Sequence, residues 1–416
     1  MSSRAPDIDK ALAAIDEERL VKLAIDAASI ASPLGDDAEL ARFLDEHMRA
    51  HGLRSRLQWL DPTRANVLGS IEGSGGGRRL MLNVNTENDF APDATTVAPA
   101  RVDGGWLTGA GIWNMKGALV AAIEAATAVR ASGVELTGDA LVAGVAAMMD
   151  MAPVETRLSG TQHTGFGAGT RHMLVEGVAA DMAVVGTPTS FRMLRQQFGT
   201  SAVRIDVVGK PFFYETVDSV LGNFTDMNPA GESPIQQIAD VVQAVHEWIP
   251  DYARRTAVEG VRPYVRIAGI ESGKPWLPTA AEDGSIFVYV GTPPGAGLSD
   301  ALDELRAVVD GVRRAKHPQL DARVELYSVN PAPFVAEDHP LVAELAAAHE
   351  SVHGEQLEAA VAIWHSDSSV LARNGIPAVS YGMPGRLEPT GDESVRVADL
   401  VACARVYAEL IVRVCR

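Results

Sequence analysis

Apolar residues recur at helical spacing in two segments near the start of the chain, Leu20 to Ser29 and Ala38 to Gly52. The intervening Ala-Ser-Pro-Leu-Gly-Asp-Asp is typical of a loop that caps the second helix. Two β-like segments follow, Ala65 to Glu72 and Arg79 to Val84, and the Gly-Ser-Gly-Gly-Gly between them predicts a hairpin or a flexible turn. The first part of the chain therefore predicts two helices followed by strands.

A helix and a buried strand alternate in the next part of the chain. Lys116 to Arg130 has the pattern of an amphipathic helix, and Ala140 to Met149 is almost unbroken in apolar residues, as in a sheet covered on both faces. Asp181 to Gly186 predicts another short strand. This alternation indicates an α/β sheet. Residues 151–169 show no periodicity, and a loop of that length inside a domain is usually functional.

The pattern changes at Ser201 to Val208, where strict alternation predicts a sheet with one solvated face and hence a new domain. Pro234 to Glu247 and Leu298 to Arg314 predict two helices. Val265 to Ile270 and Ile286 to Val290 predict strands. Together these segments indicate a smaller α+β unit.

The chain then returns to the first domain with a helix at Leu341 to His353, a strand at Ala378 to Tyr381 and a helix at Val397 to Arg416. We therefore expect an α/β fold in which a mixed-sheet domain with helices on both faces, residues 1–198 and 329–416, is interrupted by an α+β domain of residues 199–328.

Composition limits the class of protein. The chain has 416 residues, of which 47% are hydrophobic and 22% are charged, as in a soluble globular protein of two domains. Its 36 basic and 54 acidic residues give a net charge of -18, which disfavours nucleic acid and anionic membrane as partners. There is no apolar run of membrane-spanning length and no hydrophobic signal segment, so we expect a cytoplasmic protein. Cys403 and Cys415 are too far apart along one helix for a disulfide, so reduced thiols are expected.

Several motifs together resemble one known family. They are Leu-Met-Leu-Asn-Val-Asn-Thr-Glu from Leu80, Gly-Ala-Gly-Ile-Trp-Asn-Met-Lys-Gly from Gly109, and the shorter stretches Ser32-Pro-Leu-Gly-Asp-Asp, Arg64-Ala-Asn-Val, Gly186-Thr-Pro-Thr and Gly375-Ile-Pro-Ala-Val. The framework is similar to the metallopeptidase family of acetylornithine deacetylase, succinyl-diaminopimelate desuccinylase, aminoacylase and carboxypeptidase G. The resemblance runs from Leu23 to Arg416 and implies a catalytic domain interrupted by a lid domain, residues 199–328, which often dimerises.

The chain departs from the family at the positions that hold its two metal ions or act on the metal-bound water. These positions are occupied by Asn85, Asn114, Met151, Ala152, Thr187 and Pro389. Glu87 stands where the family has the Asp that orients the first His ligand. In the lid, the stretch that carries a His in related enzymes is Gly209-Lys-Pro-Phe-Phe213, and the Asp-x-Arg that grips a substrate carboxylate is Tyr289-Val-Gly291.

These substitutions remove the chemistry that the resemblance implies. Two divalent cations need imidazole and carboxylate donors, which Asn, Thr, Met, Ala and Pro do not supply. A bound metal lowers the pKa of water by roughly nine units, worth ~12 kcal/mol. Met151 at the general-base position offers no proton acceptor. We therefore expect a metal-independent protein with no cofactor, unless a non-standard divalent metal site is formed by Glu87, Asp89, Asp150, His163 and His365.

Polar residues expected at the old pocket suggest a replacement chemistry. Candidate catalytic residues are Asn85, Glu87, Asn114, Asp150 and His365, and candidate substrate-binding residues are Trp113, His163, Thr187 and Glu388. The two asparagines are suited to donate hydrogen bonds to a substrate carbonyl, and Glu87, Asp150 or His365 to move protons.

Structural interpretations of the same residues stay open. Asn85 and Asn114 are equally suited to bind loop backbone, and Glu87 to be a solvated remnant. His365 is a candidate for packing or for a helix start, and Trp113 for the core. His365, Ser366 and Asp367 do not predict a serine-hydrolase triad, because the chain has no Gly-x-Ser-x-Gly.

Three functions follow from these observations. The first is a repurposed enzyme that performs amide hydrolysis, cyclisation or elimination on a small amino-acid-like or acylated substrate. The second is a pseudoenzyme that serves as a binding or partner subunit, and the third is a metallohydrolase with a non-standard metal site. The resemblance implies a homodimer formed through the lid, while Trp113, Phe212, Phe213 and Tyr214 suggest a less anionic or more aromatic substrate.

Overall fold

The chain forms two compact units in a computed structural model that describes residues 5–88, 94–148, 166–209, 234–273, 283–297, 299–363, 365–388 and 391–416. The larger unit comprises Met1–Gln196, Pro333–Ala360 and Ser366–Arg416, and the smaller comprises Gln197–Ala332 with Val361–His365. The expected domains, 1–198 with 329–416 and 199–328, differ from this division at the junctions and in the placement of Val361–His365.

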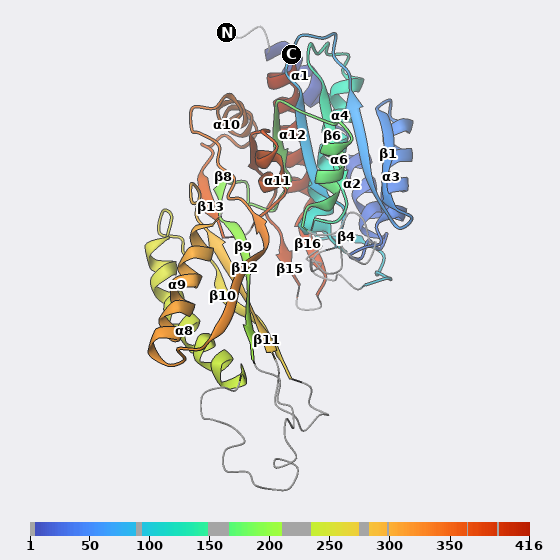
Figure 1. Ribbon diagram of the computed structural model, residues 1–416. Coiled ribbons are helices and arrows are strands. Elements are labelled where there is room, and N and C mark those ends of the chain that lie inside the picture. Colours follow the sequence, from blue (N-terminus) through green and yellow to red (C-terminus); the bar gives the residue numbers. More distant parts are fainter. Residues whose placement is uncertain are drawn as a thin grey trace, which may run out of the picture. The chain divides into compact units, whose positions relative to one another are not determined.

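An eight-stranded sheet forms the centre of the larger unit, in the order β1-β2-β6-β3-β7-β14-β8-β13 (Figure 1). The bounds of its strands are Arg54–Asp61 (β1), Arg64–Ile71 (β2), Leu80–Asn85 (β3), Ala140–Val145 (β6), Met182–Val185 (β7), Met193–Gln197 (β8), Ala359–Ala362 (β13) and Ala378–Ser380 (β14). β3 is parallel to β6 and to β7, and β14 is parallel to β7, whereas β2 is antiparallel to both β1 and β6.

Helices pack around this sheet. They are α1 (Ala5–Ala13), α2 (Glu17–Ala28), α3 (Ala38–Ala50), α4 (Gly117–Ala131), α6 (Ala168–Val175), α10 (Pro340–His353), α11 (Ser368–Arg373) and α12 (Val397–Cys415). The short η1, Ile112–Lys116, leads into α4. A second small sheet has the order β15-β16-β5-β4, with bounds Arg386–Leu387, Glu393–Arg396, Trp106–Gly109 and Arg101–Asp103.

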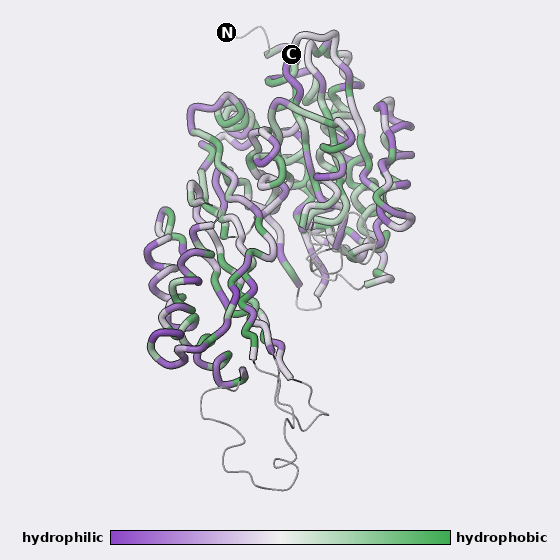
Figure 2. Tube along the Cα trace, in the orientation of Figure 1, coloured by the Kyte–Doolittle hydropathy of each residue, from purple (hydrophilic) through white to green (hydrophobic). Residues whose placement is uncertain are grey.

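Burial explains which of these elements lie in the middle. Every residue of β3 and β6 is buried, and so is nearly every residue of α4, which the sequence pattern described as amphipathic. Figure 2 shows hydrophobic residues along this interior and hydrophilic residues on β1 and α3 at its margin. Cys403 and Cys415 are both buried and free, as expected.

Of the two alternatives expected for the segment between β2 and β3, a hairpin or a flexible turn, the hairpin is wrong. The glycines after Ile71 do not join a hairpin, because β6 lies between β2 and β3 and pairs with both. β6, which comes from a later part of the chain, separates β2 from β3. The local sequence pattern of β2 and β3 does not indicate this separation.

The smaller unit is a four-stranded antiparallel sheet in the order β10-β11-β9-β12 with two helices. The bounds are Val265–Ser272 (β10), Asp283–Thr292 (β11), Gly199–Val208 (β9), Asp321–Asn330 (β12), Pro234–Arg255 (α8) and Asp300–Ala315 (α9). Its core joins one face of the sheet to the apolar sides of α8 and α9. This pattern, with the mixed sheet of the larger unit, confirms the expected fold class. Among the described helices, none combines the length and the apolarity needed to cross a bilayer.

Candidate functional site

Parallel strands bring several of the predicted residues to one edge of the large sheet. Asn85 is the last residue of β3, Thr187 follows β7, and Tyr381 follows β14. Since these strands are parallel, their carboxyl ends lie at the same edge, which is where open α/β sheets usually bind ligands.

Asn85 and Glu87 form a buried turn at this edge, and each is about 1% exposed. The Asn85 side-chain oxygen accepts the backbone N–H of Glu87 at 3.2 Å, which directs the amide nitrogen of Asn85 away from the turn. The Glu87 Oε1 accepts the backbone N–H of Ala147 at 2.9 Å. Ala147 follows β6 and has a positive φ of 58°. The two side chains are therefore oriented by backbone contacts rather than solvated.

Asn114 lies in a loop that one carboxylate holds in place. The Glu393 side chain accepts the backbone N–H groups of Gly111 at 3.1 Å, Trp113 at 3.0 Å and Asn114 at 2.7 Å. Burial raises the pKa of Glu393 to about 7, although these hydrogen bonds and the charge of Lys116 favour its ionised form. Sequence analysis did not single out Glu393, yet it is the last residue of the Glu-Pro-Thr-Gly-Asp-Glu stretch.

Lys116 is fully buried next to this loop. Its Nζ donates to the carbonyl oxygens of Ile30 at 2.7 Å and Ala27 at 3.3 Å. Burial lowers the pKa of Lys116 to about 8, while the charge of Glu393 opposes that shift. The ammonium is engaged with the backbone of the last turn of α2 and of the residues that follow it, so its position supports the fold of the loop.

Trp113 packs against the hydrophobic core of the larger unit. A Cβ added at Gly385 would lie 2.3 Å from the Trp113 ring, so the indole rests directly on the backbone there. This environment is that of a wall or core residue.

Thr187 has a buried hydroxyl without a hydrogen-bond partner among the described residues. Its backbone N–H donates to the Val185 carbonyl at 2.8 Å. An unsatisfied buried hydroxyl is unusual and needs an explanation such as a ligand.

Two further candidates lie elsewhere. Glu388 follows β15 and accepts a hydrogen bond from Arg386 at 2.7 Å, and this contact together with one from Ser394 lowers its pKa. His365 belongs to the smaller unit, where its Nδ1 contacts Thr200 and Tyr289. Asp150 and His163 lie outside the described residues, as do Asp89, Met151, Ala152, Pro389, Phe212, Phe213 and Tyr214.

A buried carboxylate that the sequence analysis assigned no role also belongs to the larger unit. Asp367, about 1% exposed, accepts a hydrogen bond from the Thr170 hydroxyl at 2.9 Å, and Thr170 in turn accepts one from Asn83 at 3.0 Å. Burial raises the pKa of Asp367 to about 6. No local motif marks this network, because its members come from β3, α6 and the start of α11.

The described donors at this edge do not suit a pair of divalent cations. Asn85 and Thr187 carry neutral oxygens, the Asn85 oxygen is engaged with the Glu87 N–H, and Glu87 itself binds Ala147. Among the described residues, no three His, Cys, Asp or Glu side chains converge in a way that would hold a metal. Two dications need compensating negative charge, which this set does not supply.

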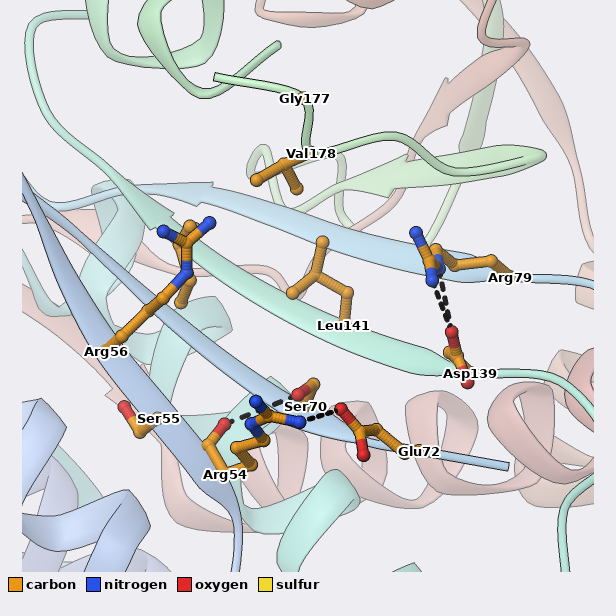
Figure 3. A pocket seen from close by; sticks show the side chains of 11 residues that line it. Arg54, Ser55, Arg56, Ser70, Glu72, Arg79, Asp139, Leu141, Gly177 and Val178 are labelled. Carbon is orange, nitrogen blue, oxygen red and sulfur yellow. Dashed lines mark hydrogen bonds and ion pairs between the residues drawn. The ribbon is translucent and has the colours of Figure 1, made fainter. Parts of the chain in front are cut away.

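A separate hollow of about 450 Å³ opens at the opposite end of the same strands (Figure 3). Arg79 and Asp139, which precede β3 and β6, form an ion pair there, as do Arg54 and Glu72. Arg56 also lines it from β1. None of the predicted site residues that the structure describes lines this hollow, so it is not the edge described above.

Comparison with known proteins gives one family match and several distant relatives. Residues 84–413 match the model of peptidase family M20/M25/M40. The N-formyl-4-amino-5-aminomethyl-2-methylpyrimidine deformylase of Halalkalibacterium halodurans is 23% identical, with 98% of this chain and 97% of that protein aligned. The protein of the same name from Bacillus subtilis is 24% identical over 85% of this chain and 84% of its own. The crystal structure of aminopeptidase PepT from Bacillus cereus shares the fold, with a TM-score of 0.70 at 14% identity over 97% of this chain and all, 100%, of that one.

Proposed function

The chain belongs to peptidase family M20/M25/M40, and we propose that it is a metal-independent amidohydrolase that cleaves the N-formyl or other N-acyl group of a small, uncharged amine derivative. The observation that carries the proposal is the oriented pair of Asn85 and Glu87 at the carboxyl edge of the sheet. The names of the distant relatives, which are deformylases of a pyrimidine amine, support the choice of substrate class.

The reaction proposed for these residues is hydrolysis of an amide C–N bond by water. Glu87 takes a proton from water, and the resulting hydroxide attacks the carbonyl carbon of the amide. The amide N–H groups of Asn85 and Asn114 donate to the oxygen as it becomes negative. The C–N bond then breaks, the proton passes from Glu87 to the leaving nitrogen, and a carboxylic acid and an amine are released.

Local geometry favours these roles. The Asn85 oxygen accepts the Glu87 N–H, so the amide nitrogen of the side chain points away from the turn. The Glu393 carboxylate fixes the N–H groups of Gly111, Trp113 and Asn114, which pre-organises the second donor. Donors held in place before the reaction stabilise a developing oxyanion more than mobile ones do.

The test combines metal analysis with turnover. We expect purified protein to hydrolyse N-formyl-4-amino-5-aminomethyl-2-methylpyrimidine or a simpler formylated benzylamine equally well before and after dialysis against a chelator. Glu87→Gln should lower kcat by roughly 100-fold or more, as for loss of a general base. Glu176→Gln, which changes an exposed carboxylate after α6, is the matched control.

Two results would overturn the proposal in different directions. Two stoichiometric divalent ions per chain, with turnover that disappears on chelation, would identify a metallohydrolase with a non-standard site. Binding of these amides without any turnover would identify a non-catalytic binding subunit.

A further inference from the structure

Asp37 is a buried carboxylate at the end of the loop that precedes α3. It is the N-cap residue of α3, and its side chain is fully buried. An aspartate at this position usually accepts an N–H of its own helix, but the Asp37 side chain makes no such hydrogen bond with α3. The carboxylate is therefore engaged with another part of the larger unit.

The partner of Asp37 is Thr86, the residue between Asn85 and Glu87. The Thr86 hydroxyl forms a hydrogen bond with one carboxyl oxygen of Asp37, although 49 positions separate the two residues. The other carboxyl oxygen accepts the backbone N–H of Ala65 on β2 at 3.3 Å. Thr86 is also fully buried, so the contact is shielded from water and is stronger than it would be at the surface.

Thr86 also connects the turn to β6. Its backbone N–H donates to the Val145 carbonyl oxygen at 3.0 Å, and its Oγ1 lies 3.1 Å from the same oxygen. Val145 is the last residue of β6, and Ala147, two residues later, donates its N–H to the Glu87 carboxylate. A shift of Thr86 away from Val145 would therefore move Glu87 relative to Ala147.

The loop that carries Asp37 also binds the residue on the other side of Glu87. The backbone N–H of Asn88 donates to the carbonyl oxygen of Ser32 at 2.8 Å. Ser32 and Asp37 belong to the same Ser-Pro-Leu-Gly-Asp-Asp stretch. The residues immediately before and after Glu87 are thus both bound by this stretch, which leaves the backbone of Glu87 little freedom to shift.

Asp37 engages the Thr86 hydroxyl whether or not the carboxyl group is ionised. A hydroxyl has a single hydrogen, so Thr86 cannot donate to Asp37 and to the Val145 carbonyl at the same time. Burial raises the pKa of Asp37 to about 6, so both forms are populated near that pH. The protonated form donates to Thr86, which then donates to Val145, whereas the ionised form accepts from Thr86. The hold on the turn therefore does not require a charge on Asp37.

We propose that Asp37 is a positioning residue for the amide hydrolysis: through the Thr86 hydroxyl it holds the turn against β6 and so fixes the Glu87 carboxylate. A general base acts only within hydrogen-bond reach of the proton that it takes, and small displacements of a positioned group slow the chemical step. The inference rests on the proposed function, because the position of the turn affects turnover only if Glu87 is the general base.

The experiment measures kcat and KM of full-length variants with N-formyl-4-amino-5-aminomethyl-2-methylpyrimidine. Asp37→Ala and Thr86→Val should each lower kcat by about 10-fold and change KM by less than about 2-fold, because the turn supports the transition state rather than substrate binding. The double variant should be no slower than Thr86→Val alone, since Asp37 acts through Thr86. Asp37→Asn should stay within about 2-fold of the parent, because its amide can accept from Ala65 and donate to Thr86.

The controls separate positioning of the turn from a general loss of stability. Asp36→Asn changes an exposed carboxylate next to Asp37 and should leave kcat within about 2-fold of the parent, inside the range of surface substitutions. Amide hydrogen exchange followed by NMR tests the turn without any substrate. The Ala147 N–H, which Glu87 accepts, should exchange about 10-fold faster in Asp37→Ala than in the parent or in Asp37→Asn. Urea unfolding of each variant ensures that the rates are those of folded protein.

Any of three results would overturn the inference. These are a kcat of Asp37→Ala equal to that of Asp36→Asn, effects of Asp37→Ala and Thr86→Val that multiply in the double variant, or Asp37→Asn as slow as Asp37→Ala. Failure of the proposed function has a different signature, because the parent itself would then show no turnover. In that case hydrogen exchange decides: equal exchange of Ala147 in Asp37→Ala and the parent overturns the inference, whereas faster exchange that Asp37→Asn reverses supports the hold of Asp37 on the turn.

Discussion

The carboxylate of Glu393 accepts the backbone N–H of Asn114 at 2.7 Å, although 279 positions separate the two residues. The same carboxylate binds Trp113 and Gly111, so it replaces water for three N–H groups of one loop. Loops held in this way present a side chain in a single orientation, which is what the assignment of Asn114 as an oxyanion donor requires.

Glu393→Gln should destabilise the protein and slow it. An amide offers one oxygen where the carboxylate offers two, so at least one buried N–H would face an –NH₂ group. We expect a loss of about 1–3 kcal/mol in the free energy of unfolding, measured with urea, and a lower kcat. Glu72→Gln, which alters an exposed ion pair with Arg54, should cost less than about 1 kcal/mol. Equal losses in both variants would contradict this role of Glu393.

A second buried carboxylate, that of Glu124, pairs with an arginine and also accepts the backbone N–H of Asp16 at 2.9 Å. The side chain of Glu124 on α4 is fully buried, and Arg19 on α2 donates to it through Nε at 2.7 Å and through a second nitrogen. Arg19→Met should cost about 3–5 kcal/mol, because it leaves a buried charge without its partner. Adding Glu124→Leu should recover most of that loss.

The matched control for this pair is Lys22→Met, which removes an exposed partner of Asp26 on the same helix. We expect a change of no more than about 0.5 kcal/mol there. If the Arg19→Met protein and the double variant were equally unstable, the contribution of Arg19 would lie in its packing rather than in its charge.

The stability of the protein should fall as Asp367 ionises. Burial raises the pKa of this carboxyl from its ordinary value of 3.8 to about 6. The folded chain therefore binds the proton more tightly than the unfolded chain, and the benefit that is present below pH 3.8 is lost as the pH rises through 6. Relative to Asp367→Asn, the unmodified protein should lose about 3 kcal/mol between pH 4 and pH 7.

Urea unfolding of both proteins at several pH values provides the measurement. All other titrating groups are common to the two, so the difference between the curves isolates Asp367. Curves that stay parallel from pH 4 to pH 7 would show that the carboxyl titrates normally.

Thr187→Val should separate stability from activity. The buried Oγ1 of Thr187 has no partner within the described part of the chain, so replacing it with a methyl group should raise the free energy of unfolding by about 1 kcal/mol. If the hydroxyl binds substrate, kcat/KM should fall by about 10-fold at the same time.

Thr127→Val provides the comparison, since the Thr127 hydroxyl on α4 is also buried and lacks a partner among the described residues. The stability gain should be similar and turnover should not change. Unchanged turnover in both variants would remove Thr187 from the site.

The sequence predicted most of the elements in which buried positions produce a regular pattern of apolar residues. α4 was found because its apolar residues recur at helical spacing, β6 because it is almost unbroken in apolar residues, and β9 because its residues alternate. β1 was missed because it is an edge strand with three exposed residues among its first six, and Arg-Ser-Arg has no strand pattern. The hairpin between β2 and β3 was wrongly expected because the order of strands depends on partners that lie far away in the sequence.

The candidate site residues fall into two groups, those with contacts close in sequence and those with contacts far away in sequence. Asn85 and Glu87 could be singled out because they are close together in a recognisable motif, and the turn between them is local. Glu393 was not singled out, because its partner Asn114 lies 279 positions away. The contact of Asp367 with Thr170, 197 positions away, could not be predicted either. His365 was singled out from its sequence neighbours, but the residues that it contacts, Thr200 and Tyr289, are distant in sequence.

The backbone around Gly291 leaves little space for a side chain, because a Cβ there would lie 2.9 Å from the Tyr264 carbonyl oxygen. An arginine at this position requires the Pro263 to Tyr264 segment to withdraw first, and that segment is tied to β11 by the Gly291 N–H. A single substitution therefore gives a strained strand. Any redesign that adds a charged side chain here has to begin with the backbone that precedes β10, and only afterwards with the side chain itself.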